Sequence, residues 1–146
     1  MGKKGAEIVI VETHAERETE DAGERLAKCL HAGAVVALYG DLGAGKTAFV
    51  RGMARGLELR EQVSSPTFTI VNEYPGTPAL FHFDMYRLKN AEELYAIGWD
   101  DYLARDGIVV TEWTENVEEA IPADAVRVTI ERTGDTGRRI RIEGML

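Results

Sequence analysis

The stretch at residues 40–47, with the sequence GDLGAGKT, limits most strongly what this chain can fold into. It fits the phosphate-loop pattern G-x-x-x-x-G-K-[ST], which lies between a strand and a helix. Residues 34–39 before it form a short, continuously apolar run, typical of a strand buried on both faces of a parallel sheet. After it, apolar side chains recur at the spacing of a helix that Gly56 could end: Phe49, Val50, Met53 and Leu57. The pattern therefore predicts the strand, loop and helix of an α/β fold.

Glycines make this stretch suitable for wrapping phosphate groups. A triphosphate is held by inward-pointing backbone N–H groups, which requires the close approach and left-handed torsions that glycine allows. The helix beginning near Lys46 directs its unpaired N–H groups at the anion, while Lys46 reaches the β and γ phosphates and Thr47 offers a hydroxyl to Mg²⁺. A glycine-rich turn that binds nothing is the alternative, but a chance match with correct flanks is rare. We therefore expect nucleotide binding by Gly40, Asp41, Leu42, Gly43, Ala44, Gly45, Lys46 and Thr47.

Length and composition fit one globular domain over residues 1–146, in which 45% of the residues are hydrophobic. The formal net charge of −8 disfavours direct binding to nucleic acid or anionic membranes. No apolar run approaches the roughly 20 residues of a membrane-spanning helix, and the N-terminal residues do not form a secretion signal. The single cysteine, Cys29, falls in an amphipathic helix pattern, where we expect a buried thiol. These features favour a cytoplasmic protein with no membrane contact.

A second strong signal is the segment at residues 107–113, GIVVTEW. Its aliphatic residues predict a buried strand, and that strand ends on the acid Glu112. This is the pattern of a Walker B strand, whose acid holds Mg²⁺ opposite the hydroxyl of the phosphate loop. Such a strand can also be purely structural, but a phosphate loop in the same chain favours the metal-binding role. Trp113 would then stand beside the nucleotide.

Another carboxylate stands near the end of the strand predicted at residues 79–86. Alternation along this segment puts His82 and Asp84 on one face. Two roles are open for Asp84. It can start a turn or pair with Arg87, or it can lie near the Mg²⁺ or the attacking water of a hydrolysis reaction.

Hydroxyl side chains are dense at residues 63–71, VSSPTFTIV, ahead of a strand that would pair with residues 79–86 across a turn at residues 74–78. These hydroxyls can simply cap their own backbone. In nucleotide switches, however, a loop hydroxyl completes the Mg²⁺ shell when the γ phosphate is present. Thr67 is the first candidate for that role and Ser65 the second.

The N-terminal part of the chain predicts a strand followed by a helix. Residues 8–11 alternate as a strand, and the sequence THAE at Thr13–Glu16 has the form of a capping box. The helix that it opens should end at Gly33, just before the buried strand. Further along, Asn90 is the expected N-cap of a short helix that stops at Gly98.

The end of the chain predicts a β-hairpin, because residues 125–131 and 138–143 alternate around the turn GDTG. The fold class is therefore α/β: a P-loop NTPase-like domain with a mixed, mainly parallel central sheet, flanking helices and a C-terminal β-hairpin. The hairpin arginines are either a solvated face or a contact to the adenine side or a partner: Arg138, Arg139 and Arg141.

Four motifs follow one another along the chain: the phosphate loop, SPTF at residues 65–68, HFDMYR at residues 82–87, and Glu112-Trp113. With these motifs in this order, the sequence resembles the TsaE (YjeE) family of small bacterial P-loop ATPases. The resemblance covers nearly the whole chain. It implies a role in making N6-threonylcarbamoyladenosine at position 37 of tRNA, together with TsaB and TsaD, and TsaD carries the transfer to tRNA. A protein of charge −8 that leaves tRNA to its partners agrees with this role.

Carried over to this sequence, the family pattern puts Lys46 on the phosphates and Thr47 and Glu112 on Mg²⁺. The family's Asp falls on Asp84, and its switch-like segment on residues 65–67. The adenine side of the family falls on Glu16, Thr19 and Arg138. The expected activity is hydrolysis of Mg-ATP with water oriented near Asp84, slow until partners complete the site.

Two other functions compete with this one. A small-molecule kinase also suits a phosphate loop on a short α/β domain, but such enzymes usually carry an arginine-rich lid, and no compact arginine-rich insertion occurs in the sequence. A GTP-dependent switch would need a guanine-recognition string of the Asn-Lys-x-Asp type, which is missing from the sequence.

Overall fold

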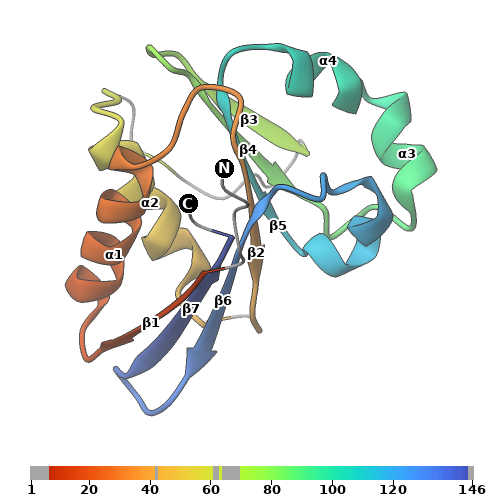
Figure 1. The fold of residues 1–146 in the computed structure, drawn as a ribbon. Helices are drawn as coiled ribbons and strands as arrows, with labels where there is room; N and C mark the ends of the chain where they lie inside the picture. Colours follow the sequence, from red (N-terminus) through yellow and green to blue (C-terminus); the bar gives the residue numbers. More distant parts are fainter. Residues whose placement is uncertain (1–6, 42, 61–62, 64–69, 145–146) are drawn as a thin grey trace.

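A single sheet organises the computed structural model, which describes residues 7–41, 43–60, 63 and 70–144 (Figure 1). Within these residues the sheet has the strand order β1-β7-β6-β2-β5-β4-β3. The strands are β1 (Ile8–Thr13), β2 (Val35–Tyr39), β3 (Val71–Tyr74), β4 (Leu80–Asp84), β5 (Ile108–Glu112), β6 (Val126–Arg132) and β7 (Arg138–Glu143). The middle strands β6, β2, β5 and β4 run parallel, and β1, β7 and β3 are antiparallel to their neighbours. The predicted α/β class and the mixed sheet with a parallel middle are confirmed.

Helices cover the two faces of the sheet differently (Figure 1). The long helices α1 (Glu16–Lys28) and α2 (Lys46–Gly56) lie side by side on one face. The short helices α3 (Ala91–Ala96), α4 (Trp99–Ala104) and the 3₁₀ segment η1 (Thr114–Ala120) pack against the other. Alternate residues of β4 reach two different cores: Leu80 packs with α1 and α2, and Phe81 and Phe83 pack with the short helices.

Glycines set the distance between α1 and α2. A Cβ at Gly52 of α2 would come within 1.8 Å of the Glu20 carbonyl oxygen, and one at Gly23 of α1 within 2.1 Å of the Phe49 carbonyl oxygen. Gly56, expected as a helix stop, is the last residue of α2 and also faces α1, since its Cβ would lie 2.7 Å from the Glu24 oxygen. Backbone therefore packs on backbone here, which fixes where α1 begins relative to the phosphate loop.

The start of α1 differs from the sequence prediction. The capping box at Thr13–Glu16 does not form, because β1 pairs with β7 as far as Thr13 opposite Arg138. The helix begins at Glu16 with Ala15 as its N-cap, and no side chain caps it. The Thr13 hydroxyl instead shares a 2.9 Å hydrogen bond with the Thr19 hydroxyl. The predicted first strand is thus two residues longer than residues 8–11.

The end of α1 also corrects two expectations. The helix ends at Lys28, so Gly33 does not end it and lies in the following turn with φ +94°. Cys29 becomes the C-cap residue and is exposed, and the expected buried thiol is wrong. The short helices behave as predicted. The Asn90 side chain accepts from the Glu93 N–H at 3.1 Å, and Gly98 takes φ +98° between α3 and α4.

Among the described residues, no helix is both long and apolar enough to cross a lipid bilayer.

Candidate functional site

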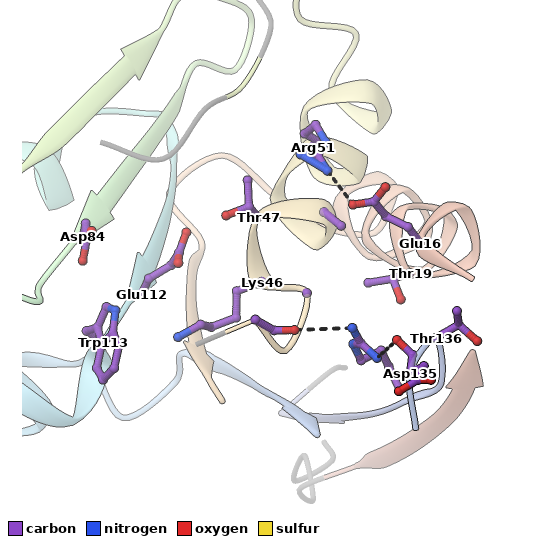
Figure 2. Close-up of a pocket in the computed structure, with 14 residues that line it drawn as sticks. Glu16, Thr19, Lys46, Thr47, Arg51, Asp84, Glu112, Trp113, Asp135 and Thr136 are labelled. Atoms are coloured by element: carbon purple, nitrogen blue, oxygen red, sulfur yellow. Dashed lines mark hydrogen bonds and ion pairs between the residues drawn. The ribbon is translucent and has the colours of Figure 1, made fainter. Parts of the chain in front are cut away.

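A pocket of about 580 Å³ opens beside the phosphate loop (Figure 2). It lies where β4 and β5 of the parallel middle end, which is where α/β sheets bind their ligands. Figure 2 shows Asp84, Glu112 and Trp113 on one side of the loop residues Lys46 and Thr47, and Thr19, Asp135 and Thr136 on the other. The lining residues are Glu16, Thr19, Gly43, Gly45, Lys46, Thr47, Ala48, Arg51, Asp84, Glu112, Trp113, Asp135, Thr136 and Arg138.

The loop has the backbone shape that its glycines were expected to allow. Gly40, Gly43 and Gly45 have φ values of +142°, +80° and +103°. A Cβ at Gly40 would also come within 2.5 Å of the Ile130 carbonyl oxygen. The predicted loop residues Gly40, Asp41 and Ala44 line an adjoining hollow against β6, and Leu42 lies outside the described residues. The remaining predicted loop residues line the pocket itself.

Lys46 is held at the centre of the site. Its side chain is buried, and its Nζ donates to the Gly40 carbonyl at 2.7 Å and lies 4.6 Å from the centroid of the Trp113 ring. The described contacts of the ammonium are thus one backbone acceptor and one aromatic face. Its positive charge is therefore left for an anion in the pocket.

Glu112 ends β5 as predicted, and its carboxylate contacts His82, a residue to which the sequence assigned no role. The Nε2 of His82 lies 2.6 Å from Glu112 Oε2, and His82 is fully buried on the neighbouring strand β4. An ionised carboxylate can only accept, so with Glu112 ionised Nε2 is the donor. Nδ1 of His82 has no partner within the described residues. The sequence placed His82 on one face with Asp84 but could not show that β4 and β5 are adjacent.

Asp84 lies opposite Glu112 in the register of β4 and β5. Partial burial raises the pKa of Asp84, and the nearby Glu112 carboxylate raises it further, although the Tyr86 N–H, which donates to Asp84 Oδ1 at 3.0 Å, opposes this. The turn role and the site role that the sequence left open are therefore compatible. Asp84 accepts a local backbone hydrogen bond and also lines the pocket.

We expect the variant Asp84→Asn to be slightly more stable than the wild type at pH 7. Because the pKa of Asp84 is raised in the folded state, the folded protein binds a proton at this carboxylate more tightly than the unfolded chain does. The contribution of Asp84 to the unfolding free energy therefore falls as the pH rises above the ordinary pKa of aspartate. Asparagine carries no charge and keeps the acceptor for Tyr86. Thermal unfolding against pH, with the exposed Asp106→Asn as control, should show the gain near neutral pH and little difference in strong acid. A less stable Asp84→Asn protein at pH 7 would contradict this reasoning.

Trp113 follows Glu112 and adopts φ +57°, which is rare for a bulky residue. Its ring packs against the exposed Tyr86, with centroids 5.1 Å apart, and forms the wall beside Lys46. The sequence predicted Trp113 beside the nucleotide, and the structure places it in the lining of the pocket. Strain held at a site residue is a common feature of functional positions.

The far end of the pocket unites residues that are remote in sequence. Glu16, Thr19 and Arg138, expected on the adenine side from the family resemblance, all line it. The sequence reasoning missed Asp135 and Thr136 of the hairpin turn, and Arg51, whose Nη2 pairs with Glu16 at 3.0 Å (Figure 2). Local spacing could not show the turn residues, because the pairing of β7 with β1 brings the turn here, whereas Arg51 lies one helical turn after Thr47 on α2 and its spacing was the available signal. Ser65 and Thr67 lie outside the described residues.

The loop, whose glycines have positive φ, lies between the buried parallel strand β2 and the helix α2 and faces the carboxylate at the end of β5, the neighbouring strand in the sheet. This arrangement defines an α/β P-loop domain. Residues 13–140 match the sequence model of the family described as "Threonylcarbamoyl adenosine biosynthesis protein TsaE". The chain belongs to this TsaE family.

Curated relatives agree with the family match, and each is named tRNA threonylcarbamoyladenosine biosynthesis protein TsaE. The Bacillus subtilis relative is 40% identical over 124 residues, covering 84% of this chain and 77% of its own. The Treponema pallidum relative is 37% identical, covering 86% of this chain and 93% of its own. The Streptomyces coelicolor relative is 42% identical, with coverages of 83% and 84%.

A solved structure shows the same fold. The crystal structure of YdiB from Bacillus subtilis superposes with a TM-score of 0.80 at 32% identity, covering 99% of this chain and 90% of that chain. The family resemblance stated from the four sequence motifs is thus confirmed by the family model and by the curated relatives.

Proposed function

We propose that this protein hydrolyses Mg-ATP as a cytoplasmic component of N6-threonylcarbamoyladenosine synthesis on tRNA, acting with TsaB and TsaD. The names of its relatives, which describe proteins of tRNA threonylcarbamoyladenosine biosynthesis, support the tRNA-modification role. The main observation that supports an ATPase activity is that Lys46, Thr47 and Glu112 line one pocket beside the loop. Its volume of about 580 Å³ lies in the range of small-molecule and cofactor sites.

The oxygen donors of the site fit Mg²⁺. Thr47 offers a hydroxyl and Glu112 a carboxylate, and Asp84 lies next to Glu112 on the adjacent strand. Magnesium in nucleotide sites typically takes one or two such protein ligands and completes its shell with phosphate oxygens and water. When bound, Mg²⁺ would neutralise the charge that develops on the transferred phosphoryl group.

The protein's own groups divide the work of hydrolysis. The loop N–H groups and Lys46 hold the phosphates, and the Lys46 ammonium stabilises their negative charge. His82 keeps the Glu112 carboxylate in one orientation through the 2.6 Å contact to Oε2. In this proposal Asp84 accepts a hydrogen bond from the attacking water, and Thr67 is the loop hydroxyl near the γ phosphate.

The isolated protein should turn over ATP slowly, because its pocket arginines are already engaged. Arg51 pairs with Glu16 and Glu20, and Arg138 donates to backbone carbonyls. Within the described pocket no other arginine is available to stabilise the transition state of phosphoryl transfer. A partner that supplies such a charge would raise the rate. The acidic protein then leaves contact with tRNA to TsaB and TsaD.

The test is ATP turnover by the purified protein, alone and with TsaB and TsaD, with GTP as a second substrate. We expect a low rate alone, a rise of at least about tenfold with the partners, and a preference for ATP. A rate that the partners leave unchanged would contradict the partner-completed ATPase. Phosphate transfer to a small-molecule acceptor would instead replace the proposal with a kinase.

A further inference from the structure

Arg138, the first residue of β7, bonds to the backbone of two separate loops. In the phosphate loop its Nε donates to the Ala44 carbonyl at 2.9 Å and its Nη2 to the Gly43 carbonyl at 3.3 Å. In the hairpin turn its Nη1 donates to the carbonyls of Gly137 at 2.7 Å, Gly134 at 3.2 Å and Asp135 at 3.5 Å. The planar guanidinium thus bridges the loop and the turn with all three of its nitrogens.

This bonding differs from that of the other arginines whose contacts the structure describes. Seven of them pair with carboxylates: Arg51, Arg55, Arg105, Arg127, Arg132, Arg139 and Arg141. Arg138 forms no ion pair among the described residues, and its acceptors are backbone carbonyls. Hydrogen bonds of a charged donor are stronger than neutral ones, so they can fix the peptide groups to which they bind.

The loop is the part of the site that most needs fixing. Gly43 and Gly45 give it the freedom to wrap phosphates, and the same freedom lets its peptide groups rotate. In a trans peptide the N–H points away from the C=O, so holding the carbonyls of Gly43 and Ala44 also sets the directions of the N–H groups of Ala44 and Gly45. The Ala44 N–H accordingly points across the loop to the Asp41 carbonyl at 3.0 Å.

We infer that Arg138 is a positioning residue that holds the phosphate loop in its binding shape before any nucleotide arrives. This inference rests on the proposed nucleotide-binding function and deepens it. It assigns Arg138 a role different from a direct contact with the adenine side, because most of its N–H donors are already bonded to protein carbonyls. It also gives the C-terminal hairpin a function: the turn at residues 134–137 anchors the guanidinium from the side opposite the loop.

Hydrogen exchange of the nucleotide-free, full-length protein tests the inference directly. Exchange of the loop amides, Ala44 above all, should rise at least about tenfold in Arg138→Ala. Arg138→Lys should behave similarly, since a single ammonium cannot replace the fork of donors. The matched control is Arg139→Ala, whose side chain pairs with Glu12 at 2.8 Å and with Glu131 at 4.0 Å and forms no described hydrogen bond to the backbone of the loop or the turn. It should leave loop exchange unchanged.

Affinity for ADP, measured on the same proteins, should fall roughly tenfold in both Arg138 variants and stay constant in Arg139→Ala. Weaker ADP binding with unchanged loop exchange would overturn the inference and make Arg138 a direct ligand. Slow loop exchange in Arg138→Lys would also overturn the inference, because a positive charge without the fork of donors would then be enough to hold the loop. Faster exchange that extends to the β2 amides would show general destabilisation and count against it. Failure of the wild type to bind nucleotide would refute the proposed function alone, because loop exchange is measured without ligand.

Discussion

The variant Glu112→Gln is expected to lose ATP turnover by about 100-fold or more while still binding nucleotide. Glutamine has nearly the same shape, but it removes the charge that would hold Mg²⁺ opposite the Thr47 hydroxyl. The loss should be large because Glu112 is buried and oriented by the 2.6 Å contact to His82, so its carboxylate is held in one place in the site. Nucleotide affinity should change far less, since the loop and Lys46 bind the phosphates.

The control for Glu112→Gln is Glu115→Gln, a substitution of the same chemistry three residues further on, at an exposed position of η1. Steady-state turnover with saturating ATP and Mg²⁺ compares the two. We expect wild-type rates in Glu115→Gln. Rates within a factor of a few of the wild type in Glu112→Gln would show that this acid does not take part in the reaction.

The largest effect on stability is expected from Gly52→Ala, which should lower the unfolding free energy by about 3 kcal/mol. The new methyl would lie 1.8 Å from the Glu20 carbonyl oxygen and 2.6 Å from its carbon, so α1 and α2 must move apart. The gain in helix propensity of alanine over glycine, about 1 kcal/mol, opposes this but is smaller. The separation would also carry Glu16 and Thr19 away from the loop, so nucleotide affinity should fall with stability.

Thermal unfolding measures this effect, with Gly134→Ala as the matched control, because a Cβ at Gly134 meets no atom within 4 Å. The melting temperature of Gly52→Ala should drop by roughly 10 °C, and that of Gly134→Ala should stay close to the wild-type value. Equal melting temperatures for the two variants would mean that the two helices can separate without cost.

Local pattern was sufficient for the loop and for most of the sheet. The glycines of residues 40–47 and the apolar run before them are read within one short window, and Glu112 is recognisable because it ends such a run. The alternation along residues 79–86 likewise predicted that His82 and Asp84 share one face of β4. These features depend only on residues that are close in the sequence, so a single sequence is enough to predict them.

What the sequence missed depends on contacts between distant segments. The capping box at Thr13 fails because β7, more than a hundred residues later, extends β1 to that residue. The contact between His82 and Glu112 requires β4 to lie beside β5, which no local pattern specifies. The backbone packing at Gly52 could not be predicted either, since a glycine within a helix gives no indication of which residue it packs against. Tertiary pairing decides each of these features.

Calorimetric titration with a non-hydrolysable ATP analogue tests whether the pocket beside the phosphate loop binds Mg-ATP. The wild type should bind one molecule, more tightly with Mg²⁺ than with a chelator present. Lys46→Ala should weaken binding roughly 100-fold, since it removes the cation that meets the phosphates, while the exposed Lys89→Ala should bind like the wild type. Equal affinity in Lys46→Ala and the wild type would show that the nucleotide binds elsewhere and not in this pocket.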